Sequence, residues 1–113
     1  MTESITLPDF TQARVLIFGD TILDRYWKGD TSRISPEAPV PVVHVKQVDN
    51  RLGGAANVAL NIRTLGTKVK LFGICGQDEA GDNLTTLLQQ NQIESELLKL
   101  PNLSTITKLR ILS

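Results

Sequence analysis

Two carboxylates, Asp20 and Asp24, follow a short apolar run at residues 15–18 that has the composition of a β-strand. In open α/β sheets, ligands bind beyond the carboxyl ends of the strands. A carboxylate in that place can accept hydrogen bonds from the hydroxyls of a sugar, and its charge strengthens them. The simpler role of a turn or cap residue competes with this chemistry, and we expect the simpler role for Asp20.

A pair of glycines, Gly53 and Gly54, stands directly before a helical pattern that ends at Gly66. Adjacent glycines give a backbone without Cβ atoms that can also adopt positive φ. The first N–H groups of a helix lack partners within it, so a polar ligand could approach the glycines closely and be held there. We interpret the pair as one wall of a sugar site, and a tight loop that only needs positive φ is an equal alternative. The spacing matches neither the dinucleotide fingerprint nor the P-loop.

Two basic residues, Lys108 and Arg110, share one side of a strand pattern at residues 106–112. Such a pair could clamp a phosphate, although a solvated strand face is the simpler interpretation. His44 has no second His or Cys pair beside it, so the sequence predicts an exposed strand histidine and no metal site. Cys75 has no base or second thiol close in sequence, and we interpret it as a small buried apolar residue.

These residues must be positioned by strands that alternate with helices, which predicts an α/β fold with a mostly parallel sheet flanked by helices. The apolar run at 15–18 does not alternate, and it predicts a central strand buried on both faces. Asp78 is placed to cap the second helix. We expect strands at residues 15–18, 42–48, 68–76, 95–100 and 106–112, and helices at 55–65 and 78–92.

Residues 24–50 carry no helical pattern and predict a small β lid that stands away from the main sheet. Pro36, Pro39 and Pro41 exclude a helix from this region. Prolines are tolerated on edge strands better than on central ones. We therefore expect an edge strand at residues 42–48 of this lid.

Composition limits the classes of function. The chain has 113 residues, 41% of them hydrophobic, with 12 basic residues balanced by 12 acidic ones. This balance argues against a nucleic-acid or anionic-membrane partner. The single cysteine, the N-terminus without a basic and apolar leader, and the lack of a long apolar run predict a cytoplasmic protein.

The segment GGAANVALNIRTLG at residues 53–66 resembles the N-terminal signature of the ribokinase-like (PfkB) carbohydrate kinases. Residues 76–81, GQDEAG, are similar to the G-x-D-x-x-G segment of that family, and residues 19–24 to its first strand and loop, with Asp24 at the substrate aspartate. Residues 23–27, 32–43 and 105–110 more closely resemble the heptose 7-phosphate kinases of the family. The resemblance runs from about residue 7 to residue 113.

The resemblance implies transfer of the ATP γ-phosphate to the anomeric hydroxyl of D-glycero-D-manno-heptose 7-phosphate, on the route to ADP-heptose and lipopolysaccharide. Asp24, Gly53, Gly54 and Asn57 would hold the sugar. The lid would shield the sugar from water and contribute to a homodimer contact.

The resemblance also implies that the catalytic aspartate and the sites for ATP and Mg²⁺ lie downstream. Residues 1–113 would then be the N-terminal portion of one sugar-kinase domain, with no catalytic residue of their own. We expect them to be inactive alone and to expose apolar sheet faces. Another sugar or nucleoside kinase of the family is one alternative, and a non-catalytic α/β module that dimerises through the lid is another.

Overall fold

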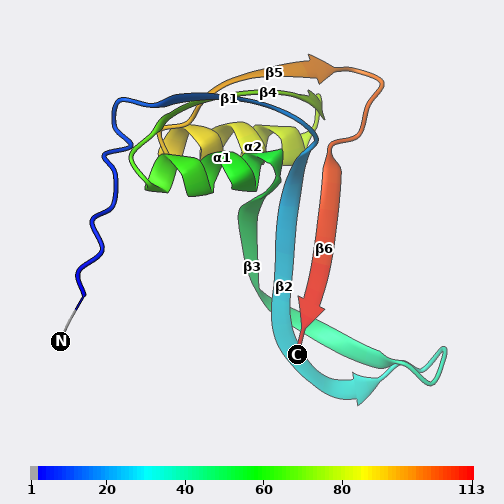
Figure 1. Ribbon diagram of the computed structural model, residues 1–113. Helices are drawn as coiled ribbons and strands as arrows, with labels where there is room; N and C mark the ends of the chain where they lie inside the picture. Colours follow the sequence, from blue (N-terminus) through cyan, green and yellow to red (C-terminus); the bar gives the residue numbers. More distant parts are fainter. Residues whose placement is uncertain (1–2) are drawn as a thin grey trace.

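The computed structural model describes residues 3–113, which fold into two sheets and two helices (Figure 1). The α/β class predicted from the sequence is confirmed, with a parallel sheet and flanking helices. The elements in chain order are β1 (Arg14–Phe18), β2 (Thr21–Ile34), β3 (Pro41–Gly54), α1 (Ala55–Thr64), β4 (Lys68–Gly76), α2 (Glu79–Gln90), β5 (Glu94–Leu100) and β6 (Ile106–Leu112).

The first sheet and both helices form what we call the body. Its strands run in parallel in the order β1-β4-β5, and α1 and α2 lie together on one face of this sheet (Figure 1). Leucines at the spacing of an amphipathic helix bring α2 onto the sheet, and Leu84 and Leu88 are fully buried there. The remaining buried apolar side chains of the body are Ala56, Ala59, Val69, Leu71, Cys75 and Ile93.

The opposite face of the body sheet is exposed along the described residues. Phe18 is 71% exposed, although its ring stacks on Phe72 with the ring centroids 5.0 Å apart. Leu16, Ile74 and Leu98 are also exposed. The prediction of a central strand at residues 15–18 is therefore wrong for this part of the chain, because β1 lies at the edge of the sheet and has one open face. The apolar run gives β1 apolar side chains on both faces of the sheet, but the helices cover only one of these faces.

The second sheet, which we call the lid sheet, has the order β3-β2-β6. β2 and β3 form a long antiparallel hairpin, and β6 runs parallel to β2 on its other side. The hairpin extends away from the body (Figure 1), and the molecule measures 58 × 52 × 19 Å. The strands are longer than the sequence pattern predicts, because two register shifts, at Lys28/Gly29 and at Asp30/Arg33, interrupt the alternation.

The two helices begin in different ways. Gly54 precedes α1 without a side-chain cap, whereas the carboxylate of Asp78 accepts a hydrogen bond from the Gly81 N–H at 2.8 Å, which confirms the predicted cap of α2. Neither helix in the described part of the chain is long and apolar enough to cross a membrane.

Candidate functional site

Asp24 lies against Gly53 at the root of the lid sheet. A Cβ atom on Gly53 would stand 2.8 Å from Cγ and Oδ1 of Asp24, closer than real side-chain contacts allow. Gly53 of β3 is paired with Ile22 of β2, and Asp24 lies two residues further along the same face of β2. The missing side chain of Gly53 therefore makes room for the carboxylate in its present position.

Gly54 has a different task. Its φ is 57°, a backbone conformation that favours glycine, and a Cβ there would lie 2.5 Å from the main-chain oxygen of Asp20. That same oxygen accepts a hydrogen bond from the Ala55 N–H at 2.8 Å. Asp20 thus supports the turn from β3 into α1 through its main chain, and its side chain is exposed.

A hollow of about 350 Å³ opens between the lid sheet and the two helices. Asp24 lines it from β2, and Asn57 lines it from the first turn of α1. Within residues 3–113, no other side chain forms a hydrogen bond or ion pair with the Asp24 carboxylate. Its carboxylate oxygens are thus available to accept hydrogen bonds from a ligand, and the amide of Asn57 can both donate and accept. The other lining residues are Tyr26, Asn50, Arg51, Leu52, Leu60, Leu87 and Asn91.

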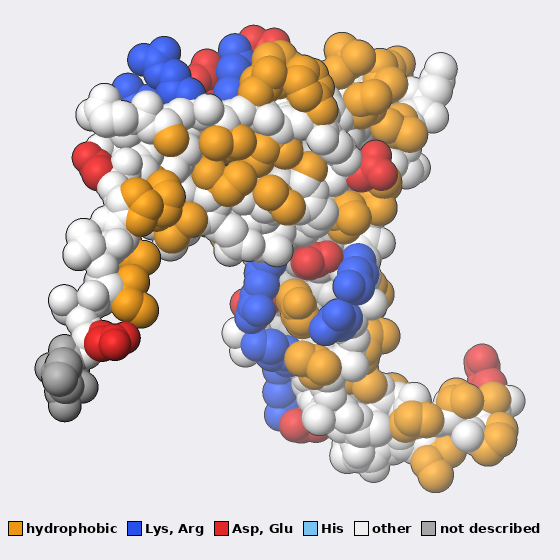
Figure 2. Space-filling model, viewed as in Figure 1, with side chains coloured by type: hydrophobic (Ala, Val, Ile, Leu, Met, Phe, Trp, Pro, Cys, Tyr) orange, Lys and Arg blue, Asp and Glu red, His pale blue; other side chains and the backbone are white. Residues whose placement is uncertain are grey.

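Two basic residues of β6 lie beside this hollow in the register of the lid sheet. Lys108 is paired with Asp24, and Arg110 is paired with Tyr26. Paired residues of neighbouring strands project to the same face, so both cations share the face of Asp24. Lys and Arg side chains gather where the lid sheet meets the body (Figure 2).

Tyr26 and Arg51 are site residues that the sequence analysis did not single out. The guanidinium of Arg51 lies 4.6 Å from the centre of the Tyr26 ring, and that of Arg110 lies 6.0 Å from it. Arg51 is paired with Asp24 across the hairpin. Tyr26 is two residues from Asp24 and Arg51 is two residues from Gly53, so each shares a strand face with a residue that the sequence did indicate. This alternation becomes informative only when the pairing of β2 with β3 and β6 is known.

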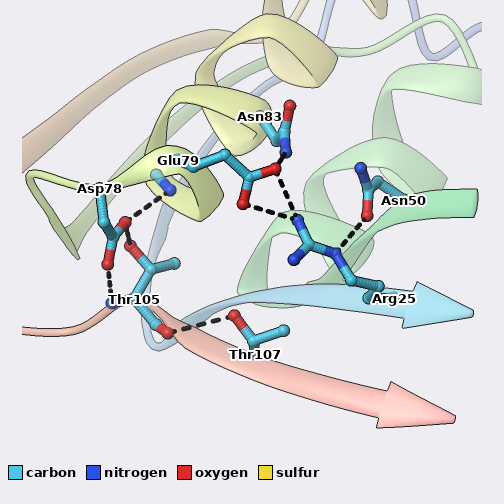
Figure 3. Close-up of polar contacts among 8 residues, drawn as sticks. Arg25, Asn50, Asp78, Glu79, Asn83, Thr105 and Thr107 are labelled. Carbon is cyan, nitrogen blue, oxygen red and sulfur yellow. Dashed lines mark hydrogen bonds and ion pairs between the residues drawn. The ribbon is translucent and has the colours of Figure 1, made fainter. Parts of the chain in front are cut away.

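The G-x-D-x-x-G segment joins the body to the start of β6 (Figure 3). Besides the cap, the Asp78 carboxylate accepts hydrogen bonds from the Thr105 N–H at 2.8 Å and from the Thr105 hydroxyl at 2.6 Å. The Thr105 Oγ1 accepts in turn from the Gly76 N–H at 2.9 Å. Bonds from the Thr105 hydroxyl, the Thr105 N–H and the Gly81 N–H hold the pKa of Asp78 below its ordinary value.

Cys75 and His44 were weighed in the sequence as a nucleophile and a metal ligand, and the structure gives neither of them such a setting. Cys75 is 1% exposed, and burial raises the pKa of its thiol, which favours the neutral form and a packing role. His44 is exposed on the lid hairpin, as expected. Across residues 3–113, no group of three or more His, Cys, Asp or Glu side chains is placed to hold a metal ion.

Known proteins place this geometry in a wider context. The chain is 56% identical to the Bifunctional protein HldE of Psychromonas ingrahamii and 58% identical to that of Shewanella amazonensis, in each case over 109 residues and 96% of the chain. These residues span 23% of the length of either relative, so the chain matches about a quarter of each.

Solved structures share the fold at lower identity. A carbohydrate kinase from Agrobacterium tumefaciens superimposes with a TM-score of 0.69 at 20% identity, covering 88% of this chain and 31% of that one. Phosphofructokinase-2 from Escherichia coli, in complex with substrates and products, gives a TM-score of 0.65 at 22% identity over 88% of this chain and 30% of that one. Residues 12–113 match the pfkB family carbohydrate kinase, and the chain belongs to this family.

Proposed function

We propose that this chain is the acceptor-sugar half of an ATP-dependent kinase that phosphorylates the anomeric hydroxyl of D-glycero-D-manno-heptose 7-phosphate. The product would be heptose 1,7-bisphosphate, an intermediate of ADP-heptose and lipopolysaccharide synthesis in the cytoplasm. One observation carries the proposal: the carboxylate of Asp24, which has no side-chain partner in the described part of the chain, lies over Gly53 and shares a hollow with Asn57. The identity to HldE proteins and the heptose-kinase motifs support the choice of sugar.

In this proposal Asp24 and Asn57 bind sugar hydroxyls, while Gly53 makes room for the Asp24 carboxylate and Gly54 forms the turn that brings Asn57 to the site. Hydrogen bonds to a carboxylate are stronger than neutral ones, so Asp24 contributes most to the hold on the sugar. Lys108 and Arg110 bind the phosphate that the substrate already carries. A guanidinium offers several donors to a phosphate, and an ammonium adds a compact charge.

The donor side of the reaction lies outside this chain. ATP supplies the phosphoryl group, and Mg²⁺ neutralises the charge that develops on it. Following the resemblance to the carbohydrate kinases, we assign the ATP and Mg²⁺ sites and the catalytic residue to sequence beyond residues 1–113. The lid sheet excludes water from the sugar and contributes to a homodimer, which its exposed Val48, Leu109 and Ile111 support.

The test compares sugar phosphates as substrates of the full-length protein. We expect heptose 7-phosphate to be preferred over unphosphorylated heptose, ribose and fructose 6-phosphate. Asp24→Ala should lower kcat/KM about tenfold to a hundredfold, because it removes charge-assisted hydrogen bonds to the sugar. Asp20→Ala is the matched control, since that carboxylate is exposed and should leave kcat/KM unchanged.

Two results would replace the proposal. A different preferred acceptor, still dependent on Asp24, would indicate another sugar or nucleoside kinase of the family. A protein that binds no sugar phosphate but loses its dimer on deletion of residues 24–50 would indicate a non-catalytic module that associates through the lid.

A further inference from the structure

One side chain of the lid sheet, that of Arg25, contacts both β3 and the body helix α2. Arg25 follows Asp24 on β2, and its side chain is only 18% exposed. Its Nε donates a hydrogen bond to Oδ1 of Asn50 on β3 at 2.9 Å. Its Nη2 donates to both carboxylate oxygens of Glu79, each at 3.0 Å (Figure 3). Two different nitrogens of the planar guanidinium thus bond Glu79 and Asn50, whereas a lysine has a single nitrogen from which to donate.

Glu79 is itself held in place. It lies in the first turn of α2, where the helix dipole favours a negative charge. Its Oε1 also accepts a hydrogen bond from Nδ2 of Asn83, one helical turn further on, at 2.6 Å. Arg25 is therefore bonded to a carboxylate that, although 71% exposed, is oriented by its own helix.

The other ion pairs of the lid sheet do not reach the body. Lys28 pairs with Asp49 and Lys46 pairs with Asp30, and both pairs join β2 to β3. The remaining described pairs lie within the body. Among residues 3–113, the Arg25–Glu79 pair is the ion pair that joins the lid sheet to the body.

Successive side chains of a strand point to opposite faces, so the contacts of Arg25 fix the backbone from which Asp24 projects on the other side. We propose that Arg25, held by Glu79 and Asn50, is a positioning residue that sets the place of the Asp24 carboxylate relative to Asn57 of α1. The inference rests on the proposed function for its ligand. It adds that the affinity for the sugar depends on the contact between Arg25 and Glu79, two residues that do not bind the sugar themselves.

The experiment measures two quantities in the full-length protein: amide hydrogen exchange of β2 and β3, and the Kd for heptose 7-phosphate by calorimetry. For Arg25→Ala we expect exchange at residues 21–28 and 48–54 to be about fivefold faster and the Kd to rise about fivefold. Exchange in β4 and α2 should remain as in the unsubstituted protein. Lys46→Ala is the matched control, because it removes a lid ion pair without contact to α2, and it should change neither quantity.

The conservative substitutions test the geometry. Arg25→Lys should recover only part of the affinity, whereas the exchanged pair Arg25→Glu with Glu79→Arg should recover more than either substitution alone. Unchanged exchange and Kd in Arg25→Ala, or an equal change in Lys46→Ala, would overturn the proposal. Faster exchange throughout β4 and α2 would also overturn it, by showing a general structural role.

The two readouts separate this inference from the proposed function. If heptose 7-phosphate does not bind the unsubstituted protein, the proposed function fails. The exchange measurement needs no sugar, and it still decides whether Arg25 holds the lid sheet against the body.

Discussion

The body and the lid sheet each contain three strands, but they differ in which side chains they bury. The body encloses a continuous set of apolar side chains between its sheet and its helices, including Leu71, Leu84 and Leu88. In the described lid sheet, the buried apolar side chains are confined to Leu23 and Leu52 at its root. Further out it carries charged and aromatic groups such as Tyr26, Arg51 and Arg110.

Under the proposed function, this difference separates stability from recognition. Burial of apolar surface is the main favourable contribution to folding, so the free energy of unfolding should depend on the body. Binding chemistry needs polar groups that keep unused hydrogen-bonding capacity, and these lie where the lid sheet meets the helices. Substitutions in the two regions should therefore affect different measurements.

The largest expected effect is in the body. Leu84→Ala removes a fully buried side chain of α2 and should lower the free energy of unfolding by about 2–5 kcal/mol. Urea-induced unfolding of the full-length protein, followed by circular dichroism, measures the change. The Kd of the folded variant for heptose 7-phosphate should remain unchanged. Val58→Ala, on the half-exposed side of α1, is the control and should change stability by less than about 0.5 kcal/mol.

An intermediate effect is expected at the junction of the two regions. Asp78→Ala removes the cap of α2 and both bonds to Thr105, and should cost about 2 kcal/mol of stability. Since the folded pKa of Asp78 is lowered, its contribution is present above the ordinary value of about 4 and is lost as the pH falls through the folded value.

Asp78→Asn separates the charge from the cap. The amide oxygen can still accept from Gly81, but it does not titrate. Unfolding curves measured from pH 7 down to pH 3 should show a smaller loss of stability for Asp78→Asn than for the unsubstituted protein. Equal losses in the two proteins would contradict the assignment of this acid sensitivity to Asp78.

The sequence was sufficient for features that depend on near neighbours. The cap at Asp78 and the leucine spacing of α2 predicted that helix, and the Gly pair predicted the turn into α1. The family resemblance then indicated the fold as a whole, and the family is confirmed. These signals are local because a cap, a turn and a helical face each involve residues within one or two turns.

The rest depends on contacts between distant residues. Nothing in the 106–112 pattern shows that β6 pairs in parallel with β2, and without that pairing Arg110 cannot be placed beside Tyr26. Arg25 and Glu79 are 54 residues apart, and no local pattern connects them. The bulges in the hairpin hide its true length from an analysis of alternation.

The smallest expected effect is a change in ligand affinity without a change in stability. Gly53→Ala would place a methyl group about 2.8 Å from the Asp24 carboxylate, the flexible end of a side chain that can turn away. We expect the melting temperature to change little, while the Kd for heptose 7-phosphate rises about tenfold, or about 1.4 kcal/mol. Calorimetric titration of the full-length protein measures it.

A double-mutant cycle shows whether this loss passes through Asp24. If the methyl group acts by displacing the carboxylate, Gly53→Ala should have no further effect on affinity in an Asp24→Ala background. A full tenfold loss in that background would mean that the backbone of Gly53 contacts the sugar directly. The lid sheet would then recognise its ligand through the main chain as well as through side chains, and the contrast with the body would rest on backbone geometry as much as on charge.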